Sequence, residues 1–106
     1  GAENIRGPSE VTIQYGGSLS VTCEYNDGFQ SYVKYWCKGE SWKSCASIIK
    51  SGDGSHHRYS IQDYPGERKF TITGREMRPE DSDTYYWGME RAFSDDMHAV
   101  RVTVLP

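Results

Sequence analysis

Polar and apolar residues alternate along most of the chain, and turn-forming residues interrupt the alternation about every 8–12 residues. Between Leu19 and Cys23, for example, the apolar side chains occupy every second position and serine or threonine fills the positions between them. A period of two predicts half-buried β-strands. The segments that we expect to form strands are 11–13, 19–23, 32–38, 45–49, 58–62, 69–73, 84–90 and 99–105, with a helical turn at 79–81.

This rhythm of short strands and turns is typical of an all-β sandwich of two antiparallel sheets. With 106 residues, we expect one domain over residues 1–106. The 12 basic and 15 acidic side chains give a net charge of -3, which argues against nucleic acid as a partner. Neither a signal peptide nor an apolar run of the roughly 20 residues that span a membrane is visible. We therefore expect an excised ectodomain whose membrane anchor is missing from this sequence.

One stretch near the end of the chain narrows the class of sandwich. Residues 78–87 read Arg-Pro-Glu-Asp-Ser-Asp-Thr-Tyr-Tyr-Trp. They resemble the approach to the second core cysteine of an immunoglobulin variable-type domain, Pro-Glu-Asp-x-x-x-Tyr-x-Cys, but Trp87 stands in place of that cysteine. The first cysteine of such a domain corresponds to Cys23, and the core tryptophan corresponds to Trp36, 13 residues later.

Three further residues fit this resemblance in structural roles. Asp81 stands where variable-type domains place an acid that pairs with an arginine at the start of a strand, here Arg58. Tyr85, two residues before position 87, matches the tyrosine whose hydroxyl bonds back to the backbone at this corner of the fold. The resemblance implies that these residues hold the sandwich together.

A narrower resemblance comes from Lys34-Tyr35-Trp36-Cys37-Lys38-Gly39, with seven residues between Cys37 and Cys45. This pattern is similar to the domains of the polymeric immunoglobulin receptor and of its relatives, the leukocyte mono-immunoglobulin-like receptors and the novel immunoglobulin-like transcripts. The resemblance implies the extracellular part of a leukocyte innate immune receptor at the plasma membrane. In the mono-immunoglobulin-like branch, ligands are mostly lipid head groups, and related phosphatidylserine receptors hold a calcium ion in the loop between the last two strands.

The family pattern also implies how the three cysteines are used. Cys37 faces outward beside the inward Trp36, and Cys45 begins the next strand of the same sheet, so a disulfide can close over the loop 38–44. Such a bridge either stabilises the domain or gives a binding loop its shape. Cys23 then has no partner, and we expect a free, buried thiol packed against Trp36 and Trp87.

Two loops carry the candidate binding residues. Phe93-Ser94-Asp95-Asp96 resembles the aromatic-Asn-Asp motif of the lipid receptors, with serine replacing asparagine. Asp95 and Asp96 are candidate calcium ligands, and Phe93 and Met97 are candidate apolar tips that touch a membrane surface. The alternative is an ordinary solvated acidic loop. In the loop 38–44, Trp42 and Lys43 are candidate ligand contacts, although Trp42 folding back onto the sheet is an equal alternative.

No nucleophile and base stand at a spacing typical of catalysis, so we expect a binding module and no enzyme. Two hypotheses remain open. The first is a lipid-binding receptor that uses a cation and the two loops. The second is a receptor for a protein that docks on an exposed sheet face carrying Tyr35 and Tyr86. The segment 26–31 lacks the basic residues of the polymeric immunoglobulin receptor, which weakens immunoglobulin binding as an interpretation. We also expect Lys34 to lean inward beside an acid.

Overall fold

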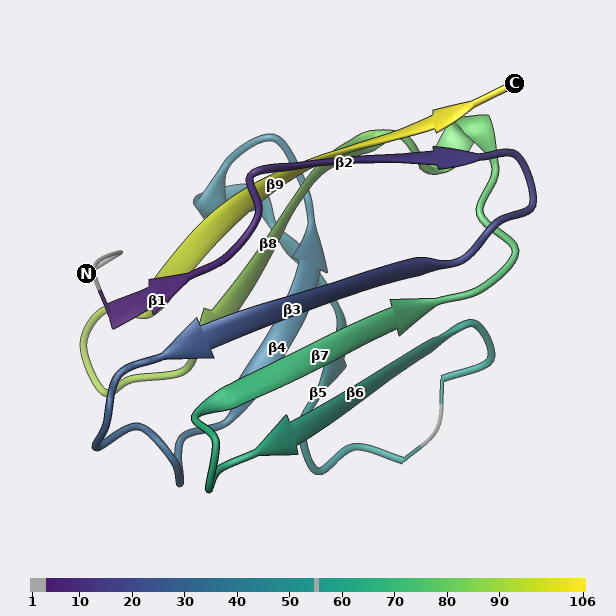
Figure 1. The fold of residues 1–106 in the computed structure, drawn as a ribbon. Coiled ribbons are helices and arrows are strands. Elements are labelled where there is room, and N and C mark those ends of the chain that lie inside the picture. Colours follow the sequence, from purple (N-terminus) through teal and green to yellow (C-terminus); the bar gives the residue numbers. More distant parts are fainter. Residues whose placement is uncertain (1–3, 55) are drawn as a thin grey trace.

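Two β-sheets pack face to face in the computed structural model, which describes residues 4–54 and 56–106 (Figure 1). The four-stranded sheet has the order β1-β3-β7-β6, and the five-stranded sheet has the order β2-β9-β8-β4-β5. All neighbours are antiparallel except β2 and β9, which run parallel. The strands are β1 (Ile5–Arg6), β2 (Glu10–Gln14), β3 (Leu19–Tyr25), β4 (Lys34–Lys38), β5 (Ala46–Lys50), β6 (Tyr59–Tyr64), β7 (Lys69–Gly74), β8 (Asp83–Met89) and β9 (Asp96–Leu105), with 3₁₀ turns η2 (Trp42–Ser44) and η3 (Pro79–Asp81).

The all-β sandwich predicted from the alternation is confirmed, and the predicted strand ends lie within two residues of the observed ones except at the start of β9. Strand β1 was not predicted, and β4 begins at Lys34 rather than at residue 32. Strand β9 begins at Asp96, three residues earlier than expected, because Asp96 and Met97 pair with Met89 and Gly88 of β8. This last difference decides where the side chain of Asp96 points.

The core lies between the sheets and is centred on aromatic rings. Trp36 of β4 stacks on Tyr85 at a centroid distance of 5.0 Å and meets Trp87 at 6.2 Å. Cys23 is fully buried in the same cluster and is a free cysteine. Burial raises the pKa of its thiol well above the ordinary value, so it stays protonated and unreactive.

The indole of Trp87 fits because a glycine lies against it. A Cβ atom on Gly7 would stand 2.1 Å from Cζ2 of Trp87, so any larger residue at position 7 collides with the indole. Within the described part of the chain, the Trp87 N–H has no hydrogen-bond acceptor. Trp87 therefore contributes through packing alone, and Gly7 supplies the space for it.

Ionic contacts tie both ends of the sandwich. At one end, Arg58 donates from Nη1 and Nη2 to the two carboxylate oxygens of Asp81, each at 3.0 Å. Tyr85 donates to the Asp81 carbonyl oxygen at 2.6 Å, which completes the predicted corner. The Arg58 hydrogen bonds hold the pKa of Asp81 below its ordinary value, although partial burial opposes this.

At the other end, Lys34 is fully buried and holds the loop between β3 and β4. Its ammonium group donates to Asp63 at 2.6 Å and to the Gln30 carbonyl oxygen at 2.8 Å. It also lies 4.3 Å from the centre of the Tyr25 ring, whose hydroxyl donates to Asp63. The predicted inward lysine is confirmed, and its partner acid comes from β6.

Candidate functional site

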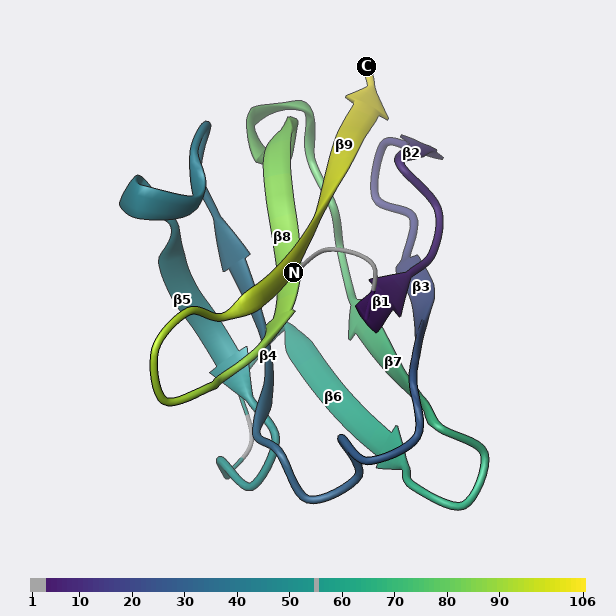
Figure 2. The same ribbon diagram turned by 90° about the vertical axis from the view of Figure 1, so that its left-hand side faces the viewer.

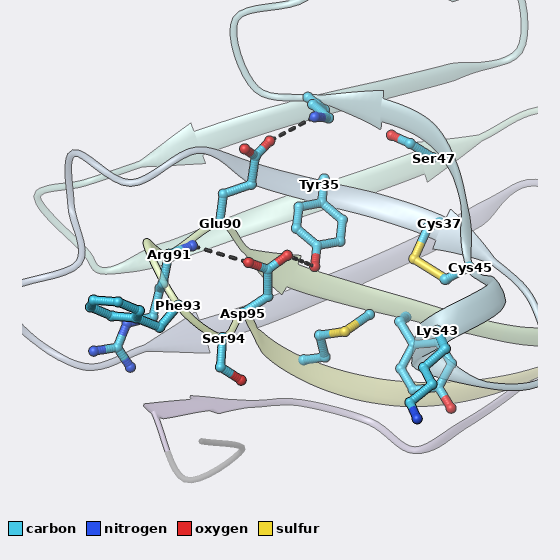
Figure 3. Close-up of a pocket in the computed structure, with 13 residues that line it drawn as sticks. Tyr35, Cys37, Lys43, Cys45, Ser47, Glu90, Arg91, Phe93, Ser94 and Asp95 are labelled. Atoms are coloured by element: carbon cyan, nitrogen blue, oxygen red, sulfur yellow. Dashed lines mark hydrogen bonds and ion pairs between the residues drawn. A yellow bond between two sulfur atoms is a disulfide. The ribbon is translucent and has the colours of Figure 1, made fainter.

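A cleft of about 870 Å³ opens beside the loop between β8 and β9, here called the β8–β9 loop (residues 90–95). Figure 2 shows this loop curling beside β4 and β5. The outer face of the five-stranded sheet forms the floor of the cleft, and the loop forms one wall. Thirteen residues line it, drawn in Figure 3: Tyr35, Cys37, Lys43, Cys45, Ser47, Lys50, Tyr86, Glu90, Arg91, Phe93, Ser94, Asp95 and Met97.

Tyr35 fixes the β8–β9 loop to the sheet. Its hydroxyl donates to Oδ2 of Asp95 at 2.6 Å (Figure 3). The ring lies against Gly88, where a Cβ atom would stand 2.5 Å from its Cζ. Burial and the Asp95 hydrogen bond raise the pKa of Tyr35, so the hydroxyl remains a donor at neutral pH. A glycine inside a strand, which usually marks a close approach, here lets a tyrosine reach the loop.

Only one of the two predicted calcium ligands belongs to the cleft. Asp95 is exposed and also accepts the Arg91 backbone N–H at 3.1 Å. Asp96 is fully buried and turned to the other side of β9, where it accepts from Arg91 Nη1 at 3.1 Å and from Asn4 at 3.3 Å. Adjacent residues at a strand start point to opposite faces, so the two carboxylates do not converge.

Over residues 4–54 and 56–106, no group of three or more His, Cys, Asp or Glu is placed to hold a metal ion. Asp95 together with one adjacent residue would supply fewer oxygen ligands than the six to eight that calcium takes, unless a bound molecule supplies the rest. Calcium binding by this loop, which was predicted for Asp95 together with Asp96, stays a prediction.

The cleft carries charges of both signs. Lys50 of β5 pairs with Glu90 at 2.7 Å, and Lys43 lies at the far rim (Figure 3). The Arg91 guanidinium lies 5.4 Å from the ring of Phe29, besides its pair with Asp96. A ligand that carries an anionic and a cationic group can find a counter-charge for each in this cleft.

The apolar side chains of the loop have different environments. Phe93 is fully exposed at the rim, and Ser94 beside it is exposed as well. Met97 was predicted as a second apolar tip, but it is half-buried in β9 and lines the cleft. Trp42 was predicted as a ligand contact, but its side chain lies outside the described part of the structure. Its backbone forms part of η2.

The predicted disulfide is present and forms part of the cleft. Cys37 and Cys45 are bonded, with Cα atoms 5.4 Å apart, and both line the cleft opposite the β8–β9 loop.

Tyr86 is half-buried on the same face. The prediction that Tyr35 is exposed on a flat tyrosine face is wrong, because the residue is only 7% exposed beneath the loop. Sequence reasoning missed Lys50, Glu90 and Arg91 as cleft residues. The available sequence signal was Gly88, a glycine inside a strand, which indicates a close approach by another group.

The strand order, the Trp36 core, the Arg58–Asp81 pair and the Tyr85 corner together define an immunoglobulin variable-type domain with a cleft beside its last loop. The family model of the immunoglobulin V-set domain matches residues 6–105. The chain belongs to the immunoglobulin V-set family.

Curated relatives narrow the group within that family. CMRF35-like molecule 3 of Mus musculus is 38% identical over 106 residues, which cover 96% of this chain and 43% of that protein. CMRF35-like molecule 7 of Homo sapiens is 38% identical over 111 residues, which cover all of this chain and 55% of that protein. The chain thus spans about half the length of these relatives. The described residues contain no helix that is long and apolar enough to cross a membrane.

Solved structures agree with this placement. The ectodomain of the teleost fish polymeric immunoglobulin receptor superposes with a TM-score of 0.87 and 28% identity, over 95% of this chain and 50% of that chain. The second immunoglobulin domain of the mouse polymeric immunoglobulin receptor gives a TM-score of 0.79 at 18% identity, over 93% of this chain and 97% of that chain. The second likeness supports the fold alone.

Proposed function

We propose that this domain is the non-catalytic, ligand-binding part of a CMRF35-like immune receptor on the outer cell surface. Its cleft binds a phospholipid head group, and Phe93 enters the surface of the lipid layer. The observation that carries the proposal is the full exposure of Phe93 at the rim of a cleft lined with charges of both signs. An exposed apolar side chain beside a polar cleft often marks an interaction site.

The forces expected at such a surface agree with this assignment. Burial of an exposed phenylalanine side chain contributes about 1.5–3 kcal/mol, which corresponds to roughly a 10–100-fold gain in affinity. Lys50 and Lys43 can pair with a phosphate, and Glu90 or Asp95 with an ammonium group. Because carboxylates repel anionic lipid, binding of a purely anionic head group needs a cation such as calcium between the lipid and Asp95.

The proposal is tested by flotation of the domain with vesicles of phosphatidylcholine alone or mixed with phosphatidylserine or phosphatidylethanolamine, with calcium or with a chelator. Phe93→Ser is expected to weaken binding about 10-fold or more. Tyr15→Ser is the matched control, since Tyr15 is 57% exposed in the turn between β2 and β3, at the opposite end of the sandwich (Figure 1). The control is expected to bind as the parent does.

Lipid binding by the Phe93→Ser variant at the parent's level would overturn the role of the loop. Full binding in the presence of the chelator would show that calcium is not required, and the proposed head-group site would stand without it. Binding to no vesicle would favour the second hypothesis, a protein ligand. That partner would then have to dock around Tyr86, since Tyr35 lies beneath the β8–β9 loop.

A further inference from the structure

A second groove lies at the open edge of the sandwich, between β5 and β6. Its volume is about 440 Å³, within the range of pockets that hold small ligands. Ile49 of β5 lines this groove, whereas its neighbour Lys50 lines the cleft described above. Successive residues of a strand point to opposite faces, so the two hollows lie on opposite sides of β5.

His56 lies at the rim of the groove, and its contacts fix the orientation of its imidazole ring. Its Nδ1 accepts the backbone N–H groups of Arg58 at 3.1 Å and of Tyr59 at 3.3 Å. The imidazole stacks on His57 at 4.6 Å and meets the Tyr59 ring edge-on at 5.3 Å. Because Nδ1 is an acceptor, the neutral ring carries its proton on Nε2. The ring therefore offers one N–H donor that its backbone contacts do not use.

Arg75 gives the groove a positive charge that the protein does not neutralise. Its guanidinium donates to the His57 carbonyl oxygen, which holds the side chain at the rim. The ion pairs formed within residues 4–54 and 56–106 do not include Arg75, whereas Arg58 is bound by Asp81. A guanidinium has five N–H donors, and most of them remain available to an oxyanion.

The rest of the groove suits a sugar ring. Ser60 and Thr73 add hydroxyl groups, and Ile61 supplies apolar surface beside the largely buried Tyr59. The carboxylate of Asp53 accepts the Lys50 backbone N–H at 3.0 Å and keeps further acceptor capacity for a sugar hydroxyl. This mixture of apolar surface, hydroxyls and one unpaired cation matches an acidic sugar, which carries an apolar C–H face, hydroxyl groups and an oxyanion.

We propose that this groove is a second binding site, for an acidic sugar whose carboxylate or sulfate binds Arg75 and the Nε2–H of His56. The site does not depend on the lipid-binding role of the first cleft. A sialylated or a sulfated glycan would present the same chemistry, and a neutral sugar would lack the group that Arg75 recognises.

The test is a titration of the ¹⁵N-labelled domain, followed by amide chemical shifts, with sialyllactose, a sulfated heparin disaccharide and lactose. Saturable shifts are expected at Arg58, Tyr59 and Arg75 with one or both acidic sugars, and none with lactose. Arg75→Gln is expected to weaken binding about tenfold or more. Arg101→Gln removes the same charge from an exposed position on β9 and is expected to bind as the parent does.

Thr73→Val tests the groove without changing its charge and is expected to weaken binding several-fold. Phe93→Ser is expected to leave sugar binding intact, which separates this site from the lipid cleft. The proposal is overturned if millimolar acidic sugar gives no shifts at these amides, if lactose gives the same shifts, or if Arg75→Gln binds like Arg101→Gln.

Discussion

The contact between Gly7 and Trp87 makes a sharp prediction about how the domain tolerates the loss of its core disulfide. In Gly7→Ala, the new methyl group would lie 2.1 Å from Cζ2 of a fully buried indole. Overpacking of this kind typically costs about 1–3 kcal/mol, and a contact this short places the loss near the upper end. In a Trp87→Cys background the indole is gone, so the same Gly7→Ala change is expected to cost less than about 1 kcal/mol.

The Trp87→Cys protein is expected to fold well enough for this comparison. Removal of the indole costs about 3–5 kcal/mol. A bridge to Cys23 closes a loop of about 65 residues and returns about 4 kcal/mol. Thiol counting on the unfolded, non-reduced proteins checks the bridge: one thiol in the parent and none in Trp87→Cys.

The assay is urea unfolding of the parent, the two single variants and the double variant under non-reducing conditions. A coupling free energy of about 2 kcal/mol between positions 7 and 87 is expected. If the two changes are additive within about 0.5 kcal/mol, Gly7 does not make room for Trp87 and the reasoning is refuted.

Three further predictions concern contacts described above. Gly88→Ala displaces the ring of Tyr35, so amide hydrogen exchange in the β8–β9 loop should become faster and vesicle binding weaker; unchanged exchange would contradict the anchoring role. The pKa of Asp81 is lowered on folding, so its stabilisation is present above the ordinary pKa of about 4 and is lost as the pH falls through the folded pKa. Between pH 7 and pH 3, the free energy of unfolding in urea should therefore fall less in Asp81→Asn than in the parent. Lys34→Ala leaves Asp63 without its buried counter-charge and should lower the free energy of unfolding by about 3–5 kcal/mol, whereas a loss below about 1 kcal/mol would show that the pair contributes little.

Features that depend on local pattern could be predicted from the sequence. The alternation located most strands because one face of each strand is buried and the other faces solvent. The disulfide between Cys37 and Cys45 followed from a family pattern and a short loop. The Arg58–Asp81 pair followed from marker residues of the variable-type fold.

The cleft could be predicted only in part, because it depends on contacts between distant segments. Because β9 begins at Asp96 and not at residue 99, the Asp96 side chain points away from the cleft and forms an ion pair with Arg91. Burial of Tyr35 arises from the loop that folds over it, which periodicity within β4 does not reveal. Lys50 and Glu90 meet across β4, a pairing set by the sheet order.

The central claim is that the tip of the β8–β9 loop enters a lipid surface. An environment-sensitive NBD dye on Phe93→Cys tests it directly, and the same dye on Tyr15→Cys is the control. Selective labelling is feasible because Cys23 is buried and its thiol stays protonated. On addition of the vesicles that the parent binds, the emission is expected to shift to the blue and gain intensity at residue 93 only. An unchanged spectrum at residue 93, or equal shifts at both positions, would contradict the account.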